Sequence, residues 1–178
     1  MSIFKAYDIR GVVPDQLSPE DAYRIGRATA RFLGAPELVI GRDARSSSPA
    51  LGEALVRGVI REGVEVVDIG MVATPMLYFA VDWLGAGGGI MLTASHNPAE
   101  YNGFKICREN AIPIGEASGL KEIEREYQQL GPAASEATPA RDGEPSARGI
   151  RRVDVVSDYV EHALSVGEGR PSFRVAID

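Results

Sequence analysis

A serine-containing hexapeptide is the segment of this chain with the clearest chemical potential. Residues 93–98 read TASHNP and directly follow a short apolar run at 90–92. In an open α/β sheet, ligands bind at the carboxyl ends of strands, so a strand at 90–92 would present Ser95 at such an edge. The alternative is a polar turn before Pro98, which is the ordinary role of clustered Ser, Asn and Pro. The hexapeptide alone does not decide between the two.

Two other segments are expected at the same end of the sheet, and both carry cations. Residues 41–46 read GRDARS and residues 102–105 read NGFK, which would place Arg42, Arg45 and Lys105 around Ser95. A transferring phosphoryl group needs fixed positive charge, because its chemistry depends on positioning and charge neutralisation. Alternatively, each cation is a solvated surface charge with a carboxylate neighbour, and Arg42 could hold Asp43 and order its loop.

A fourth segment with chemical potential lies at the N-terminus, where residues 5–12 read KAYDIRGV. Gly11 beside Arg10 permits a tight backbone and close approach of a ligand. Asp8 and Arg10 could equally form a structural ion pair. By itself this segment therefore proves little.

The elements that would position these residues alternate between strands and helices. Ser18, Pro19 and acidic residues at 20–21 mark the start of a helix that runs to about Leu33. Strands are expected at 38–41, 64–69 and 88–92, with helices at 48–62 and from Thr74, where Ser-Pro and Thr-Pro pairs repeat the start signal. The pattern predicts an α/β fold with a doubly wound mixed sheet flanked by helices.

The remainder of the chain suggests one full domain and the start of another. Residues 104–107 and 112–114 resemble a hairpin at the sheet's edge, followed by a charged helix at 120–130. Residues 131–149 are rich in Pro, Ala, Gly and Ser and predict a linker. We expect one domain at 1–150 and, at 151–178, the truncated start of a second similar domain: a helix at 155–164 and a strand at 174–177. A complete βαβ unit would need ~30 residues.

Taken together, four segments resemble, in order and spacing, the first-domain signature of the α-D-phosphohexomutase family. They are YDIRG at 7–11, GRDAR at 41–45, TASHNP at 93–98 and NGFK at 102–105. The resemblance covers nearly the whole chain, and the joint pattern is highly specific. KAYDIRG at 5–11 and YNGFK at 101–105 are most similar to the bacterial phosphomannomutase/phosphoglucomutase branch.

The resemblance implies a role for each of these residues. Ser95 would carry the phosphoryl group, and a phosphate oxygen on it would ligate Mg²⁺. Arg10 and Lys105 would stabilise charge beside the transferring group and take part in proton transfer. The remaining residues would shape the phosphoserine loop or contact substrate and phosphate: His96, Asn97, Arg42, Arg45 and Tyr7. Tyr7 could equally be a packing residue near the site.

The resemblance also implies a reaction and what this chain would lack for it. Such an enzyme interconverts hexose 1-phosphate and hexose 6-phosphate through the phosphoserine and a hexose 1,6-bisphosphate intermediate. The family's third domain carries an Asp-rich metal loop, and the sequence contains no Asp-x-Asp-x-Asp. We therefore expect the other metal ligands and the substrate-clamping domains to belong to missing domains of a parent enzyme, and negligible turnover by this chain alone.

Composition narrows the function classes further. A net charge of −6 gives no general reason to bind nucleic acid or an anionic membrane, and no apolar run approaches a membrane span. A single cysteine, Cys107, excludes an intrachain disulfide and fits a reducing, cytoplasmic setting; we expect it to be a buried strand thiol.

Two competing functions remain open at this point. One is a noncatalytic sugar-phosphate-binding or structural module. The other is a serine hydrolase using Ser95, which needs a histidine base held by an acid. His96 is the immediate neighbour of Ser95 and poorly placed as its base, His162 falls in the last predicted helix, and no Gly-x-Ser-x-Gly elbow is present.

Overall fold

The computed structural model describes residues 2–131 and 149–166, and within them strands and helices alternate as expected. In chain order the elements are β1 (Ile9–Val12), α1 (Pro19–Leu33), β2 (Glu37–Arg42), α2 (Ser48–Arg61), β3 (Glu65–Met71), α3 (Thr74–Trp83), β4 (Gly88–Leu92), β5 (Tyr101–Arg108), α4 (Leu120–Gln129), β6 (Ile150–Arg152) and α5 (Val156–Val166). Two short 3₁₀ turns, Glu109–Ala111 and Glu116–Ser118, lie between β5 and α4.

These strands form one mixed sheet in the order β1-β5-β4-β2-β3-β6. β4, β2, β3 and β6 run parallel, whereas β5 is antiparallel to both β4 and β1. The mixed α/β sheet is therefore confirmed. The edge hairpin is wrong in two respects: residues 112–114 contribute only a bridge between Pro113 and Cys107, and β5 is an interior strand. The reason is β1, which pairs along the outer side of β5.

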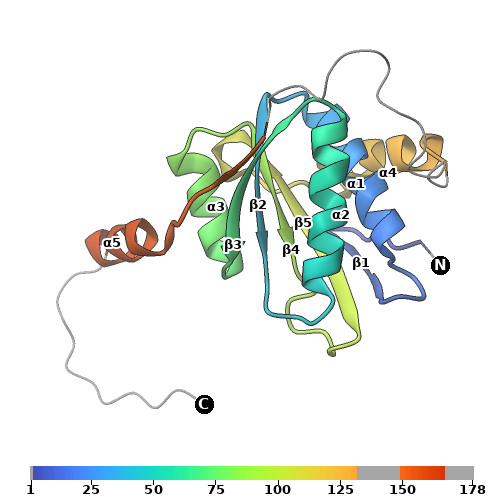
Figure 1. The fold of residues 1–178 in the computed structure, drawn as a ribbon, viewed down its shortest axis with the longest axis horizontal. Coiled ribbons are helices and arrows are strands. Elements are labelled where there is room, and N and C mark those ends of the chain that lie inside the picture. The colour runs from blue at the N-terminus through green and yellow to red at the C-terminus, as the bar shows by residue number, and fades with distance from the viewer. Residues whose placement is uncertain (1, 132–148, 167–178) are drawn as a thin grey trace.

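Helices cover both faces of the sheet, which gives three layers. In Figure 1, α3 lies on one side of the strands, and α1 and α2 lie on the other. The α1 face holds the larger core, which includes Ile9, Phe104 and Leu55; the α3 face holds Met91 and Cys107. Because side chains alternate along a strand, Arg10 and Lys105 point away from the α1 layer.

Only one of the three helix starts predicted from the sequence has the expected side-chain cap. Ser18 caps α1 as expected: its Oγ accepts from the Asp21 amide at 3.2 Å, and the Asp21 carboxylate accepts from the Ser18 amide at 2.9 Å. Ser48 and Thr74, by contrast, are the first helical residues of α2 and α3, and no side-chain cap bond precedes either helix. The Ser48 hydroxyl is used elsewhere, in the site described below.

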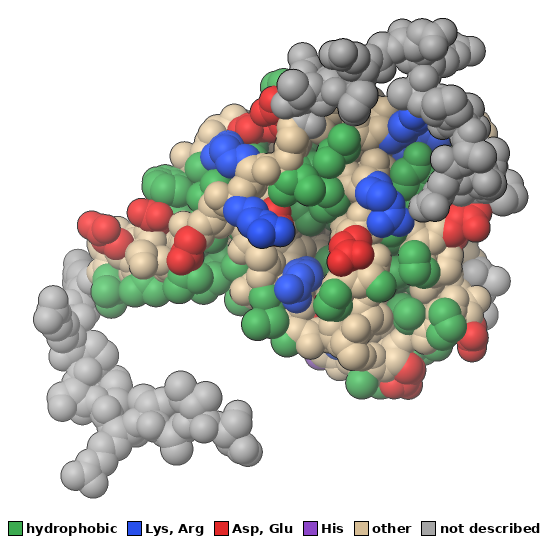
Figure 2. Space-filling view, viewed as in Figure 1, with side chains coloured by type: hydrophobic (Ala, Val, Ile, Leu, Met, Phe, Trp, Pro, Cys, Tyr) green, Lys and Arg blue, Asp and Glu red, His purple; other side chains and the backbone are tan. Residues whose placement is uncertain are grey.

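The C-terminal described segment joins the sheet and then leaves it. β6 pairs with β3, and Val155 is buried in the α3-side core. α5 projects from the body in Figure 1, and its exposed apolar side chains include Val160 and Leu164. Hydrophobic side chains line one edge of this arm in Figure 2. The boundary at residue 150 stays a prediction. Most of the 131–149 linker and the 174–177 strand lie outside the described residues.

No helix in the described part of the chain has the length and apolar character needed to cross a membrane.

Candidate functional site

Ser95 lies in the loop that follows β4, as the sequence predicts, and it has a conformation that is rare for its residue type. Its φ is 54°, in the left-handed region, which costs a non-glycine residue about 1–2 kcal/mol. The residue is exposed, while Thr93 and Ala94 before it are buried. The Ser95 amide donates to Thr93 Oγ1 at 2.9 Å. Such strained residues persist only where their surroundings hold them, and they gather at functional sites.

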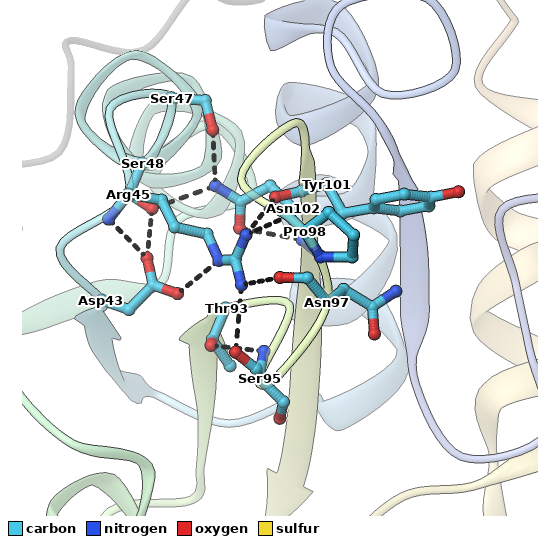
Figure 3. A network of polar contacts seen from close by, with 11 residues as sticks. Asp43, Arg45, Ser47, Ser48, Thr93, Ser95, Asn97, Pro98, Tyr101 and Asn102 are labelled. Atoms are coloured by element: carbon cyan, nitrogen blue, oxygen red, sulfur yellow. Dashed lines mark hydrogen bonds and ion pairs between the residues drawn. The ribbon is translucent and has the colours of Figure 1, made fainter.

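Arg45 supplies much of that surrounding structure (Figure 3). Its Nη2 donates to the carbonyl oxygens of Ser95 at 3.0 Å and Asn97 at 2.6 Å. Its Nη1 donates to the carbonyls of Pro98 at 2.6 Å and Tyr101 at 3.0 Å. The guanidinium therefore binds backbone on both sides of the turn that follows Ser95.

A second set of contacts holds Arg45 in place. Asp43 Oδ2 accepts from Arg45 Nε at 3.2 Å, and Asp43 Oδ1 accepts from the Arg45 amide and from Ser48 Oγ, the latter at 2.7 Å. The fully buried Asn102 donates from Nδ2 to the hydroxyls of Ser47 and Ser48. The network in Figure 3 thus ties the start of α2 to the start of β5, with the serine loop between them.

A cationic cluster lies on the other side of the loop. The nearly buried Asp8 accepts from Arg10 Nη2 at 2.6 Å and from Lys105 Nζ at 3.1 Å, both at Oδ2. Arg10 Nη1 also donates to Asn97 Oδ1 at 2.8 Å, two residues after Ser95. The ion pair between Asp8 and Arg10, foreseen as an alternative role, is therefore present, and it includes Lys105.

Strand pairing brings this cluster to the serine loop. Lys105 is opposite Met91 on β4, and Arg10 is opposite Gly103 on β5. The Gly103 carbonyl accepts from the amide of Thr93, at the start of the serine loop. A Cβ on Gly103 would lie 2.1 Å from the Ile9 carbonyl oxygen, so only glycine allows β1 to pair this closely.

The other predicted site residues differ in their surroundings. The side chain of Arg42, at the end of β2, has no hydrogen-bond or ion-pair partner in the described part of the chain, and the alternative that it holds Asp43 is wrong because Arg45 does so. His96 is exposed beside Ser95. Tyr7 is 84% exposed, so the alternative that it is a packing residue is wrong.

The surroundings of Arg45 differ from those of Arg42. As a phosphate ligand it would need free donors, but each of the five N–H groups of a guanidinium has an acceptor here: one on Asp43 and four on backbone carbonyls. Arg10, Lys105 and Arg42 are the predicted cations with donors to spare among the described residues.

A metal site is not formed by these residues alone. Within the described ranges, no three His, Cys, Asp or Glu side chains gather as a metal-binding group. Asp8 and Asp43, whose partners Arg10 and Arg45 bind the loop, are each engaged by cations. A phosphate on Ser95 would thus be a single ligand, and this part of the chain does not fit a complete Mg²⁺ site.

The geometry also bears on the hydrolase alternative and on Cys107. Among the described residues, no hydrogen bond links Ser95 to His96 or His162, and His162 instead lies on α5 with its ring centroid 5.1 Å from that of Phe79. Cys107 is a fully buried strand residue, as predicted. Burial raises the pKa of its thiol to about 12, so it is an un-ionised thiol at neutral pH.

Comparison with known proteins decides the family. Residues 1–133 match the family model described as phosphoglucomutase/phosphomannomutase, alpha/beta/alpha domain I. This chain belongs to the phosphoglucomutase/phosphomannomutase family. The resemblance noted in the sequence is thereby confirmed.

Two curated relatives of this chain are both described as phosphomannomutases but differ in length. The chain is 45% identical over 166 residues to a phosphomannomutase of Escherichia coli, covering 92% of this chain and 34% of the relative. It is 45% identical over 163 residues to a phosphomannomutase of Klebsiella pneumoniae, covering 90% of this chain and 98% of that protein. The chain thus spans about a third of the first relative and nearly all of the second.

Solved structures share the fold of this phosphoglucomutase/phosphomannomutase family member. A phosphoglucomutase/phosphomannomutase family protein of Burkholderia thailandensis superposes with a TM-score of 0.73 and 35% identity, over 92% of this chain and 35% of that one. A protein of Thermus thermophilus described as a putative phosphomannomutase gives 0.76 and 30%, over 93% and 36%.

Sequence reasoning missed several side chains that build the site. In the sequence, Ser48 fits a helix start, and Asn102 and Thr93 fall within motifs that give them no separate role. The available signal for Asn102 is its position: a polar residue that directly precedes Gly103 at the start of a strand is a candidate for a buried polar contact.

Proposed function

We propose that this chain is the phosphoserine-bearing part of a phosphohexomutase that interconverts hexose 1-phosphates and hexose 6-phosphates. One observation carries the proposal: Ser95 is exposed in a left-handed conformation at the end of β4, beside a cluster of Arg10 and Lys105. Family membership supports the same reaction class.

The reaction consists of two phosphoryl transfers in opposite directions. In the first, the free hydroxyl oxygen of hexose 1-phosphate attacks the phosphorus on Ser95; the new O–P bond forms, the Oγ–P bond breaks, and the hydroxyl proton passes to Ser95 Oγ through neighbouring groups. The product is hexose 1,6-bisphosphate. In the second, Ser95 Oγ attacks the phosphorus at position 1 of the bisphosphate; the Oγ–P bond forms, the O1–P bond breaks, and the serine proton passes to O1, which leaves hexose 6-phosphate and restores the phosphoserine.

The described residues contribute charge and geometry to these steps. Arg10 and Lys105 neutralise the transferring phosphoryl group, whose charge spreads over its oxygens in the transition state. Asp8 holds both cations at the loop. Arg42, whose side chain has no partner in the described part of the chain, and the exposed Tyr7 would contact a sugar phosphate, and His96 is the chain neighbour of the nucleophile.

Full turnover would need groups that the described residues do not supply. Mg²⁺ lowers the cost of bringing a nucleophile to a dianionic phosphate, but only a phosphate on Ser95 is proposed here as its ligand. The E. coli relative is about three times longer than the region it shares with this chain. We therefore expect this chain alone to show little or no mutase activity, because groups that orient the substrate supply several kcal/mol of rate enhancement.

Phosphate mapping tests the proposal. The purified chain is digested and its peptides are weighed by mass spectrometry, before and after incubation with glucose 1,6-bisphosphate and Mg²⁺. We expect phosphate confined to Ser95, and none on that peptide in Ser95→Ala. Phosphate on a different residue would overturn the site assignment.

A noncatalytic sugar-phosphate-binding module is the second candidate, favoured by the exposure of Ser95 and the absence of a metal-binding group in the described residues. Mixing this chain with the remaining two thirds of the E. coli relative distinguishes the two. Mutase activity above that of either part supports the enzyme; binding of glucose 1-phosphate without any phosphate on Ser95 supports the module.

A further inference from the structure

We propose that Arg45 is a positioning residue that holds Ser95 in its reactive conformation, and that it is not a phosphate ligand. This inference rests on the proposed function, because it assigns a task toward the phosphoryl-carrying serine. It concerns the backbone of the loop and not the substrate.

The first argument is that Arg45 has no donor left for a ligand. Its Nε is bound to Asp43, and its two terminal nitrogens bind four backbone carbonyl oxygens between Ser95 and Tyr101, at 2.6 to 3.0 Å. A planar guanidinium has five N–H groups, and all five are used. A phosphate oxygen could bind Arg45 only by displacing loop carbonyls.

The second argument concerns charge. The Asp43 carboxylate lies 3.2 Å from Arg45 Nε, and the Arg45 side chain is 15% exposed, so its positive charge is balanced within the protein. The cluster around Asp8 has two cations for one carboxylate. An incoming dianion is therefore drawn to Arg10 and Lys105 before Arg45.

The third argument is that the backbone of Ser95 is held by a hydrogen bond on each side. Its amide donates to Thr93 Oγ1 at 2.9 Å, and its carbonyl accepts from Arg45 Nη2 at 3.0 Å. The two peptide planes that set its φ of 54° are thus each fixed by one hydrogen bond. Without the Arg45 contact, the loop would relax toward the more favourable negative φ of an ordinary serine.

Replacing Arg45 by lysine distinguishes a positioning role from a role that needs only the positive charge. Arg45→Lys keeps the positive charge but offers a single nitrogen, which cannot reach carbonyls on both sides of the turn. A charge-based role would survive this change, whereas a positioning role would not. Arg57→Lys is the matched control, because Arg57 is an exposed residue of α2 with no partner in the described part of the chain.

The experiment combines three measurements on the chain and its two variants. Hydrogen exchange of residues 94–101 should become roughly tenfold faster or more in Arg45→Lys, about the factor expected from losing one hydrogen bond to a charged group. Exchange elsewhere should match the unsubstituted chain. Side-chain NMR of ¹⁵N-labelled arginines should show the Arg45 signals unshifted on addition of inorganic phosphate.

The third measurement is the rate of Ser95 phosphorylation at increasing glucose 1,6-bisphosphate. Arg45→Lys should lower the maximal rate by about 100-fold, the order expected for a misplaced reacting group, and leave the half-saturating concentration within about twofold. A merely destabilising change would not separate the two constants in this way.

Each outcome has a defined meaning. Unchanged exchange of the loop in Arg45→Lys, or a saturable phosphate shift of the Arg45 signals, would overturn the positioning role. If Ser95 is not phosphorylated even in the unsubstituted chain, the proposed function is wrong. Hydrogen exchange and NMR would still test whether Arg45 holds the loop.

Discussion

Two charge clusters in this molecule have the same components and different construction. In each, one carboxylate lies between two cations: Glu62 between Arg27 and Arg31, and Asp8 between Arg10 and Lys105. The first joins α1 to the end of α2, far from the serine in sequence. The second joins β1 to β5 beside the serine loop.

The Glu62 cluster is complete. Each of its carboxylate oxygens has its own partner, Oε1 with Arg27 Nε at 2.6 Å and Oε2 with Arg31 Nε at 2.9 Å. Arg31 also lies 3.7 Å from Glu126, which balances the second cation. Burial tends to raise the pKa of Glu62, but the hydrogen bonds and charges of the two arginines outweigh it and hold the pKa below its usual range.

The Asp8 cluster is incomplete. Both cations contact the same oxygen, Oδ2, and the buried Nε of Arg10 has no partner among the described residues. Lys105 makes one ion pair there, although an ammonium has three donors. Native proteins rarely leave buried polar groups unsatisfied, and functional sites are among the places where they do so. We therefore propose that the first cluster stabilises the fold and that the second is ready for a ligand.

The largest expected effect comes from breaking the incomplete cluster. Asp8→Asn removes the charge that holds Arg10 and Lys105, so the free energy of unfolding should fall by about 1–3 kcal/mol. Inorganic phosphate should bind about two- to fivefold more tightly, because the carboxylate no longer competes with it for the cations. Urea denaturation and isothermal titration calorimetry measure the two quantities.

Glu62→Gln is the control for this experiment, since it removes the same charge from the other cluster. It should leave phosphate affinity unchanged. Unchanged phosphate binding in Asp8→Asn would mean that these two cations do not bind phosphate, and the ligand-ready interpretation of the cluster would fail.

Much of the fold could be predicted from the sequence because its signals are local. The apolar run at 38–41 and the helix start at Ser18 can each be recognised from residues that are adjacent in the sequence. The structure has a strand, β2, and a helix, α1, at these positions. β1 and the interior position of β5 could not be predicted, because strand order depends on pairing between residues about 90 positions apart. The same limit applies to β6, a three-residue strand that only its pairing with β3 defines.

The sequence predicts which residues come together at the candidate site, but it does not predict which hydrogen bonds and ion pairs they form. Four motifs identified Ser95, Arg10 and Lys105 as neighbours. They did not indicate which cation is free, because Arg42 and Arg45 have the same residue type three positions apart. What separates them is the direction of the side chains: Arg45 meets backbone carbonyls, which carry no sequence signal.

A medium effect is expected from the complete cluster, and it depends on pH. Glu62→Gln should lower the free energy of unfolding at pH 7 by about 1–2 kcal/mol, since each arginine loses a charged acceptor near the surface. Because the folded-state pKa of Glu62 is lowered, its contribution is fully present above its unfolded value of about 4.5. It is lost as the pH falls through the lowered folded value.

The measurement is a series of urea denaturation curves between pH 7 and pH 3. The difference in stability between the unsubstituted chain and Glu62→Gln should be constant down to about pH 5 and should shrink below it. A difference that grows on acidification would show that Glu62 does not stabilise the fold as a carboxylate.

The smallest effect tests how far the charge of Asp8 extends. Burial of Tyr78 on α3 is the main cause that raises the pKa of its hydroxyl, and the charges of Cys107 and Asp8 add to it. Asp8→Asn should therefore lower this pKa while leaving it above the ordinary value, because burial remains. Glu62→Gln should not change it, since Glu62 joins α1 to the end of α2, on the opposite side of the sheet from α3 (Figure 1). NMR titration of ¹³C-labelled tyrosine rings at alkaline pH follows Tyr78 individually. If the pKa of Tyr78 shifts equally in both variants, Asp8 acts on Tyr78 only through the net charge of the protein. The proposed local effect of the Asp8 cluster would then be wrong.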